Sequence, residues 1–414
     1  MTSTQQPPAE VVPGAPEKWA QEGTPTTPEG WIARAKELRD IYALDDAARD
    51  RANKTPYDEI ALLKASGLGR LFGPVEMGGG AGEWPLAYKV IREVAAGDGS
   101  IGHLLGYHYM WFNVPRLAGT PEQITRIEAE ATRNNWIMAG AINARDNDVV
   151  VRDDGDYLVF NGKKNFATGV KISDVTILEG VLEGTDIHVV APVPTNQPGM
   201  ITHDNWDNMG QRLTESGSTT IKEVRVPWKD AIGFTPDKKF HERAYATMNV
   251  PLGQLVFGAI WLGIAAQALD ETAVYAHKHG KGWGGYDRLI DEPRVLDVLG
   301  DLTAKLWAAE ALMDQIAQEG LELHRNPDAV TPRSRGEYKI RSASVKIIAD
   351  ATALEITSRI FEITGARSTS EKFRFDRFWR NARTHTLHDP VFYQKQEIGN
   401  FLLHNEIPKP GWYS

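Results

Sequence analysis

The stretch VVVRDDGDYLVFNG, residues 149–162, decides the fold. It sets β-branched and aromatic runs at 149–151 and 157–160 on either side of Asp154-Gly155, and it ends in Asn161-Gly162. Asp-Gly and Asn-Gly supply the positive φ angles of tight hairpin turns, so both pairs predict turns between consecutive strands. Two further runs, 175–180 and 187–192, predict another strand pair. We therefore expect an antiparallel sheet or barrel in the middle of the chain.

Helical periodicity flanks this region on both sides. Apolar residues recur every three to four positions in segments 31–51, 56–66, 84–96 and 121–133, which Gly or Pro residues separate. The same period returns from about residue 240. One long helix there is expected to end at Gly365, with an apolar stripe formed by Ile347, Ala351, Leu354, Ser358 and Phe361.

The order of these patterns predicts an α+β fold with helical domains on both sides of a β domain. Residues 1–26, with five prolines among polar residues, are expected to form a flexible N-terminal arm. Residues 27–134 then form an N-terminal helical domain, 135–235 a central β domain, and 236–414 a C-terminal helical bundle that also serves oligomerisation. The cleft where such layers meet suits a flat cofactor.

Composition excludes several function classes. With 46 basic against 55 acidic residues and a net charge of −9, the chain has no basic field for polyphosphate, so we expect no nucleic-acid partner. The chain has no cysteine, which excludes disulfides and a cysteine nucleophile and suits a cytoplasmic location. An uncharged apolar run at 252–269 raises the question of a membrane span. Gly253, Gly258 and Gly263 favour close helix packing there instead, so we expect a buried helix and no membrane partner.

Four segments carry a resemblance to a known family: Gly102-His103-Leu-Leu-Gly-Tyr107-His108, Phe166-Ala-Thr168-Gly169, the stretch from Trp206 to Thr219 and the stretch from Phe378 to Pro390. In this order, from about residue 55 to the C-terminus, they resemble the dibenzothiophene monooxygenase family, a flavin-dependent branch of the acyl-CoA dehydrogenase superfold. The resemblance implies an acyl-CoA dehydrogenase-like fold, with an N-terminal helical domain, a central antiparallel β-barrel domain and a C-terminal helical bundle.

The resemblance also implies an activity. Members of the family take reduced flavin, usually FMN with FAD as the alternative, from a separate flavin reductase. They form a C4a-hydroperoxyflavin with O2 and insert one oxygen atom into a small apolar substrate, such as dibenzothiophene or an indole-type ring. A homotetramer is the usual assembly. We therefore expect a two-component flavin-dependent monooxygenase that acts on a sulfur or heteroaromatic compound.

By resemblance, two segments form the walls of a flavin site. Phe166 and Thr168 would pack against the ring and present a hydroxyl to its N5 edge, where the best-known members carry serine at the position of Thr168. Trp206 would close over one ring face, and Thr214 and Ser216 would supply hydrogen bonds from the following loop. The residues alone also fit an ordinary edge strand and a core tryptophan.

The phosphate candidates are Lys281 and Arg367, although either also fits a solvated surface charge. Gly140 is a further cofactor-site candidate. It falls where relatives of the dibenzothiophene type carry an asparagine near the flavin and the substrate, so the substrate can differ from theirs.

Oxygen transfer requires a pocket that excludes water, protects the flavin N5 proton and donates a proton to the departing oxygen. His388 is the first catalytic candidate; His103 and Tyr107 come next, followed by the Thr168 hydroxyl and, in a supporting role, His385. A histidine on a helix is more often a structural hydrogen-bonding group, and this alternative stays open. The i, i+3 spacing of His385 and His388 is a weak metal signal, and we expect no metal.

An FAD-dependent acyl-CoA dehydrogenase is the runner-up, and an indole-type hydroxylase is the alternative within the family. A dehydrogenase needs a carboxylate base, often in a Tyr-Glu-Gly-Thr type segment near the C-terminus. This chain carries Thr384-His385-Thr386-Leu387-His388-Asp389-Pro390 there. A third hypothesis is a non-catalytic binder of an apolar ligand on the same scaffold.

Overall fold

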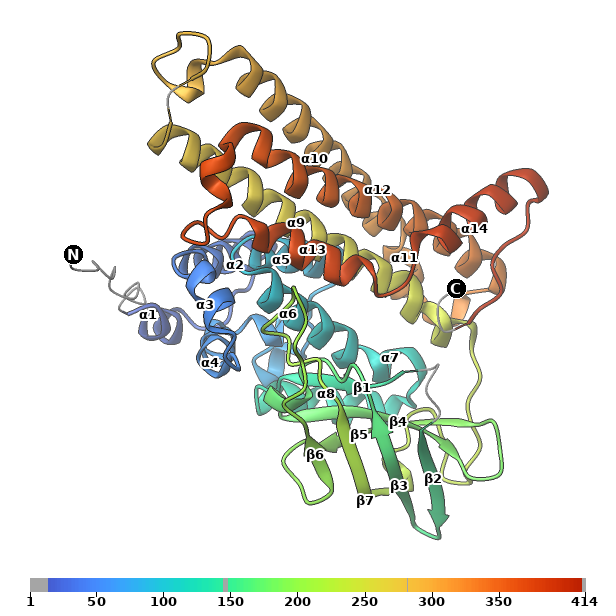
Figure 1. Cartoon of the computed structure of the whole chain (residues 1–414). Helices are drawn as coiled ribbons and strands as arrows, with labels where there is room; N and C mark the ends of the chain where they lie inside the picture. The colour runs from blue at the N-terminus through green and yellow to red at the C-terminus, as the bar shows by residue number, and fades with distance from the viewer. Residues whose placement is uncertain (1–13, 144–147, 281, 412–414) are drawn as a thin grey trace.

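The computed structural model describes residues 14–143, 148–280 and 282–411. The N-terminal helices lie between the sheet and the C-terminal bundle (Figure 1). They are α1 (Ala15–Glu22), α2 (Pro28–Ala43), α3 (Asp46–Ala52), α4 (Tyr57–Ser66), α5 (Trp84–Ala95), α6 (Gly99–Phe112), α7 (Val114–Ala118) and α8 (Pro121–Arg133). The 3-10 turns are η1 (Leu68–Arg70), η2 (Val75–Met77), η3 (Val170–Ile172), η4 (Trp228–Asp230), η5 (Ala244–Met248), η6 (Leu289–Asp291), η7 (Pro327–Ala329) and η8 (Ala366–Thr369).

Part of the segment predicted to be a flexible arm is a docked helix. Trp19 in α1 is buried, and its indole N–H donates to Glu37 Oε2 at 2.7 Å. Pro16 lies in the first turn of α1, where the missing N–H of proline breaks no helical hydrogen bond. The prediction is therefore wrong for residues 15–22, and residues 1–13 lie outside the described residues.

Two differences in the helices have physical reasons. The helix predicted over 31–51 is divided at Leu44 and Asp45 into α2 and α3. Helix α6 is absent from the predicted helical segments because all of its residues are buried. A helix that is buried on every side has no alternation of apolar and polar faces for a periodicity argument to detect.

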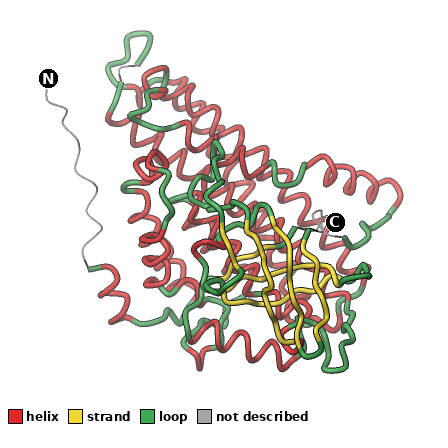
Figure 2. The backbone as a smooth tube through the Cα atoms, turned by 60° about the horizontal axis from the view of Figure 1, so that its bottom comes forward, coloured by secondary structure: helices red, strands yellow, loops and turns green. Residues whose placement is uncertain are grey.

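The central sheet is mixed rather than purely antiparallel. Its strands are β1 (Met138–Ala141), β2 (Val149–Asp154), β3 (Tyr157–Lys164), β4 (Val175–Leu182), β5 (His188–Pro194), β6 (Met200–Thr202) and β7 (Thr219–Pro227). The order is β1-β4-β2-β3-β7-β6, and β5 also pairs with β4. Strands β1 and β2 run parallel to β4, whereas all other pairs are antiparallel. Figure 2 shows these strands as a curled sheet. The antiparallel prediction is confirmed for the β2–β3 and β4–β5 pairs and is wrong for the β1–β4 and β2–β4 pairs, because alternation identifies a strand but not the direction of its partner.

The two predicted turns in the deciding stretch have different outcomes. Asp154-Gly155 forms the β2–β3 turn as predicted, with Gly155 at φ 74°. Asn161-Gly162 is not a turn, because both residues lie inside β3. The register between β3 and β7 shifts between Phe160 and Gly162, which makes this a bulge. Gly162 has a φ of 146°, and a Cβ there would lie 1.8 Å from the carbonyl oxygen of Asp148.

The C-terminal bundle consists of α9 (Asn249–Lys278), α10 (Pro293–Glu319), α11 (Leu321–Arg325), α12 (Pro332–Thr364), α13 (Asp376–Thr386) and α14 (Val391–His404). The apolar run at 252–269 lies in α9, the one described helix that is long and apolar enough to cross a membrane, and 94% of its most apolar window is buried inside the protein. The prediction of a buried bundle helix is therefore confirmed.

Helix α12 ends before Gly365, which has a φ of 67°, as predicted. The predicted stripe lies at the margin of the core: Leu354 and Phe361 are half-buried and pack against it, whereas Ala351 and Ser358 are exposed. The core face is formed by Val345, Ala349, Ala353, Ile356 and Ile360. Both stripes have helical spacing, so periodicity alone does not distinguish the inner face from an outer one.

The bulge provides a test of the fold. Gly162→Ala should lower the free energy of unfolding by at least about 1–3 kcal/mol, because the new methyl group would overlap the Asp148 carbonyl. The matched control is Gly155→Asn, since Gly155 has open space around its missing Cβ and asparagine tolerates positive φ. Urea denaturation measures both. Equal costs for the two variants would contradict the assignment of the bulge.

Candidate active site

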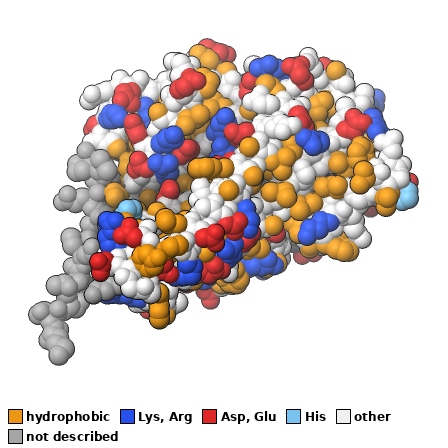
Figure 3. Space-filling model, turned by 90° about the horizontal axis from the view of Figure 1, so that it is seen from above, with side chains coloured by type: hydrophobic (Ala, Val, Ile, Leu, Met, Phe, Trp, Pro, Cys, Tyr) orange, Lys and Arg blue, Asp and Glu red, His pale blue; other side chains and the backbone are white. Residues whose placement is uncertain are grey.

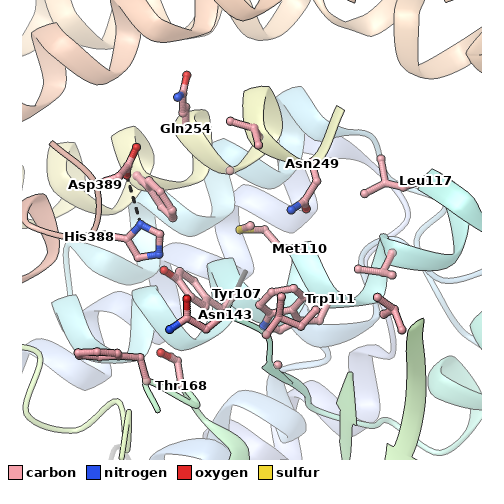
Figure 4. A pocket seen from close by; sticks show the side chains of 18 of the residues that line it. Tyr107, Met110, Trp111, Leu117, Asn143, Thr168, Asn249, Gln254, His388 and Asp389 are labelled. Atoms are coloured by element: carbon pink, nitrogen blue, oxygen red, sulfur yellow. Dashed lines mark hydrogen bonds and ion pairs between the residues drawn. The ribbon is translucent and has the colours of Figure 1, made fainter. Parts of the chain in front are cut away.

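A cavity of about 2220 Å³ lies where α6, the sheet and the C-terminal helices meet (Figure 4). The sequence candidates that line it are His103, Tyr107, Gly140, Phe166, Thr168, Trp206, Ser216, His385 and His388. Thr214 lies behind the wall, fully buried. Arg367 lies exposed on η8 and is not among the lining residues, and Lys281 lies outside the described residues. Histidines from α6 and from the end of α13 therefore share one cavity.

The imidazoles of His103 and His385 are in contact, with ring centroids 4.2 Å apart. His103 Nδ1 lies 3.1 Å from Gln211 Oε1, and Gln211 Nε2 donates to the Asn381 carbonyl at 3.2 Å. The amide oxygen of Gln211 must therefore accept, so His103 carries its proton on Nδ1. Burial lowers the pKa of His103 to about 3, although the hydrogen bond to Gln211 raises it. His103 is neutral at neutral pH.

His385 is also held neutral. The indole N–H of Trp261 donates to His385 Nδ1 at 2.9 Å. An indole nitrogen can only donate, so Nδ1 must keep its lone pair and the single proton lies on Nε2, 3.5 Å from the Tyr107 hydroxyl. Burial, together with the neighbouring His103, lowers the pKa of His385 well below its ordinary value.

His388 differs from these two because its side chain is 41% exposed, facing the cavity. Its Nδ1 lies 3.2 Å from Asp389 Oδ1 (Figure 4). Burial would raise the pKa of Asp389, but the hydrogen bond to His388 and the ammonium of the buried Lys346 lower it to about 2. The ionised carboxylate therefore orients the imidazole through Nδ1–H and leaves Nε2 to exchange a proton with a ligand.

A line of hydroxyl groups connects the cavity to the same glutamine. Thr168 Oγ1 lies 2.8 Å from Ser216 Oγ, which lies 2.7 Å from Thr214 Oγ1. Thr214 Oγ1 donates to the Gln211 carbonyl oxygen at 2.9 Å, and the Trp206 indole N–H donates to the same oxygen at 2.8 Å. Trp206 is thus fixed as a wall of the cavity.

Phe166 completes this wall. Its side chain is 66% exposed, which is unusual for a large apolar group, and its backbone has a φ of 54°. The ring meets Trp206 edge to face, with centroids 6.3 Å apart. The exposed ring of Phe166 and the half-buried ring of Trp206, beside the buried Thr168 hydroxyl, provide flat apolar surfaces and one polar contact, which is what an isoalloxazine ring requires.

Gly140 faces an indole rather than open space. A Cβ at Gly140 would lie 2.4 Å from Trp111 Cε2, so the α6 side chain occupies the position of any residue 140 side chain. Gly140 has an ordinary negative φ, and glycine is therefore required by packing and not by backbone conformation. His108 fixes this arrangement, because its Nδ1 accepts from Met138 N at 3.0 Å and its Nε2 lies 2.8 Å from the Gly69 carbonyl.

The comparisons with known proteins agree with this geometry. Residues 255–391 match the family described as acyl-CoA dehydrogenase, C-terminal domain. The chain is 37% identical to a dibenzothiophene monooxygenase of Mycolicibacterium goodii, over 92% of this chain and 96% of that protein. It is 33% identical to a probable FMNH2-dependent monooxygenase of Pseudomonas putida, over 94% of this chain and 98% of that protein.

The chain belongs to the dibenzothiophene monooxygenase family. It is therefore a flavin-dependent monooxygenase, an oxidoreductase that uses reduced flavin and O2. The FMN-bound structure of a relative from a Paenibacillus species aligns with a TM-score of 0.85 at 35% identity, over 93% of this chain and 100% of the other. Butyryl-CoA dehydrogenase of Megasphaera elsdenii, at 18% identity and a TM-score of 0.78, covers 91% of this chain and 98% of the other, and shares the fold. The acyl-CoA dehydrogenase-like fold is thus confirmed, with a curled mixed sheet in place of the antiparallel barrel.

Sequence reasoning missed three residues that this monooxygenase places around the histidines. Gln211 and Trp261 set the proton positions on His103 and His385, and Lys346 holds the Asp389 carboxylate. Gln211 lies within the segment that carries the family resemblance, next to Gly210, and its buried polar side chain is a signal that could have found it. Trp261 and Lys346 lie inside long helices, where nothing in the local sequence separates them from core residues. No group of three or more His, Asp or Glu within the described part of the chain is arranged to hold a metal.

The buried histidines predict acid lability. His103 and His108 have pKa values lowered to about 3 and about 4, with burial as the main cause, so the unfolded chain binds protons below about pH 6.5 while the folded protein does not. This contribution to stability is present above pH 6.5 and is lost as the pH falls toward these values. Each histidine should contribute a slope of about 1 kcal/mol per pH unit.

Urea denaturation at about pH 7.5 and about pH 5.5 measures this loss. His103→Gln should flatten the pH dependence, whereas His203→Ala, which changes a histidine outside the cavity, should leave it as it is. Identical unfolding midpoints at the two pH values would show that the histidines are not held neutral.

The contact between Gly140 and Trp111 predicts a coupled pair. Gly140→Ala should cost about 1–3 kcal/mol of unfolding free energy through overpacking against the indole. In a Trp111→Ala background the same change should cost much less, because the overlapping atoms are gone. A double-mutant cycle by thermal or urea unfolding gives the coupling energy. Equal costs in both backgrounds would contradict the contact.

Proposed function

We propose that this monooxygenase is the oxygenase component of a two-component system. It takes reduced FMN from a separate flavin reductase and uses O2 to oxygenate a compact apolar sulfur or heteroaromatic compound. The observation that carries the proposal is His388, held by an ionised Asp389, in the same cavity as the Thr168 hydroxyl and the exposed ring of Phe166. A relative named as an FMNH2-dependent monooxygenase and a relative solved with bound FMN support the cofactor assignment.

The residues of the cavity fit a flavin. Phe166 and Trp206 provide apolar faces for the ring, and the Thr168 hydroxyl provides a polar contact for its N5 edge. Bound reduced flavin supplies the two electrons with which O2 is divided between the product and water. The chain's own part is to exclude water with Tyr107, Trp111 and Phe257 and to hold a proton at His388 Nε2. The neutral His103 and His385 preserve the apolar character of this region.

The exposed position of Arg367, the candidate for the flavin phosphate, favours an assembly of several protomers. Arg367 lies exposed and away from the cavity of its own chain, so a contact from Arg367 to a flavin phosphate would have to come from a second protomer. The C-terminal bundle exposes large apolar side chains, among them Trp307 at 67% and Leu402 at 82%. Figure 3, which looks onto this side of the molecule, shows apolar side chains among the charged ones. A homotetramer, in which such surface would be covered, is the assembly that we propose.

The cavity also supports the substrate class. Beyond His388 its wall is formed by Tyr107, Met110, Trp111 and Leu117, with Asn249 as a polar neighbour (Figure 4). Such a surface suits a small ring or thioether. An acyl-CoA dehydrogenase would need a free carboxylate base in the 384–390 segment, whereas Asp389 there is paired with Lys346 and His388. Relatives solved with indole or named for methanesulfinate show the range of substrates to test.

Replacing His388 tests the proposal. With reduced FMN regenerated by a flavin reductase, the parent should oxygenate at least one of dibenzothiophene, benzothiophene or indole, and oxygenation of the anionic methanesulfinate alone would contradict the apolar substrate class. His388→Ala should lower product formation by about 10²–10⁴-fold, because no group remains to donate the proton, and should release the consumed O2 as H2O2. Chromatography and a peroxide assay measure the two outputs.

The control for this experiment is His203→Ala, because His203 directly follows β6 and does not line the cavity. It should retain the parental ratio of product to peroxide. A parent that binds reduced FMN yet oxygenates none of the probes, or a His388→Ala variant with the parental ratio, would refute the assignment.

A further inference from the structure

The line of hydroxyl groups behind Thr168 has a fixed direction. At its inner end lies the Gln211 carbonyl oxygen, which can only accept a hydrogen bond. The single hydroxyl proton of Thr214 is used in this bond, so Thr214 Oγ1 must accept from Ser216. The single proton of Ser216 is then used as well, and Ser216 Oγ must accept from Thr168.

Backbone hydrogen bonds hold the segments that carry Thr168, Thr214 and Ser216 against each other, so the three hydroxyl groups keep their partners. Ala167 N donates to the Gly217 carbonyl and Gly169 N donates to the Thr214 carbonyl, each at 2.9 Å. Thr214 is fully buried and Ser216 is 4% exposed, which keeps bulk water from supplying other partners. The Trp206 indole N–H and the Thr214 backbone N–H donate to the same Gln211 oxygen, so this end of the line is an acceptor for every group that meets it.

The direction of these hydrogen bonds determines what Thr168 presents to the cavity, because Thr168 lines the cavity and is 7% exposed. Figure 4 shows Thr168 among the side chains that line the cavity. Because its hydroxyl proton is donated to Ser216, its oxygen presents lone pairs and not a hydrogen to a ligand. The two redox states of a flavin differ at this contact. Reduced flavin carries a hydrogen on N5 and can donate, whereas oxidised flavin has a bare N5 that can only accept.

We infer that the fixed direction of the hydrogen bonds in this line of hydroxyl groups makes the site bind reduced FMN in preference to oxidised FMN. The inference rests on the proposed function, in which Thr168 meets the N5 edge. Reduced N5–H finds an acceptor in Thr168, whereas oxidised N5 would face a second acceptor without a proton between them. Such a site would accept the flavin that a reductase delivers and would release it after oxidation. Thr214 and Ser216 act as positioning residues, since they work through Thr168.

The test is the binding of both redox states, which needs no turnover. Dissociation constants for oxidised FMN are measured by fluorescence quenching, and those for reduced FMN by anaerobic titration. The parent should bind reduced FMN more tightly. Thr214→Val keeps the side-chain shape but removes the group that orders the chain, and Ser216→Ala removes the acceptor of the Thr168 proton. In both variants Thr168 becomes free to donate, and the ratio of the oxidised to the reduced dissociation constant should fall by about 3–10-fold.

Thr214→Ser is the matched control, because it keeps the donor to Gln211 and should retain the parental ratio. The midpoint potential of bound FMN gives an independent reading, and a tenfold change of the ratio corresponds to about 30 mV for a two-electron couple. The two variants disrupt the chain at different atoms, so either one that keeps the parental melting temperature decides the question.

The binding measurements distinguish a failure of the proposed function from a failure of the redox inference. If the parent binds neither form of FMN, the proposed function fails and the inference fails with it. If the parent binds both forms equally, or if folded Thr214→Val and Ser216→Ala keep the parental ratio, the inference alone is overturned. A loss of preference in both variants and its retention in Thr214→Ser supports the directed chain.

Discussion

The hydrogen bonds of Gln211 join the parts of the molecule that make the cavity. Its backbone N–H donates to Asn381 Oδ1 at 2.7 Å and so ties the loop between β6 and β7 to α13. Its amide oxygen meets His103 on α6, and its carbonyl oxygen ends the hydroxyl line. Gln211 has a backbone φ of 53°, a strained conformation for a non-glycine residue, and the hydrogen bonds of its backbone and side chain stabilise it. Gln211 therefore links the cavity wall at Trp206 to His103 and to α13.

The three histidines illustrate how burial divides roles among identical side chains. His103 and His385 are buried, and the position of the proton on each ring is set by its partner. The Gln211 oxygen accepts from His103 Nδ1, whereas the Trp261 indole donates to His385 Nδ1. His388 keeps contact with the cavity and has a charged partner, Asp389. An apolar environment around two neutral rings lowers the local dielectric, which strengthens the interaction of the third with any charge that develops nearby. One site thereby combines a dry interior with one group that can exchange a proton.

The family, the order of the layers and most of the cavity residues could be predicted from the sequence, because these features depend on local patterns and long motifs. The prediction was wrong where identical local signals have different tertiary outcomes. Gly155 and Gly162 follow similar residues, yet only the first lies at a turn, since the path of β7 decides where β3 needs a bulge. The outer stripe of α12 has the same period as its core face. The role of Trp261 depends on its contact with His385, which lies far away in the sequence, and no local pattern encodes such a contact.

The seating of the Trp111 indole on Gly140 restricts the order in which this lineage can change. A side chain cannot be gained at position 140 while the indole is in place, because the two would occupy the same volume. A side chain at position 140 therefore needs either a smaller residue 111 or an indole that has moved, and a smaller residue 111 alone would leave the space above Gly140 unfilled. The two positions are thus constrained as a pair.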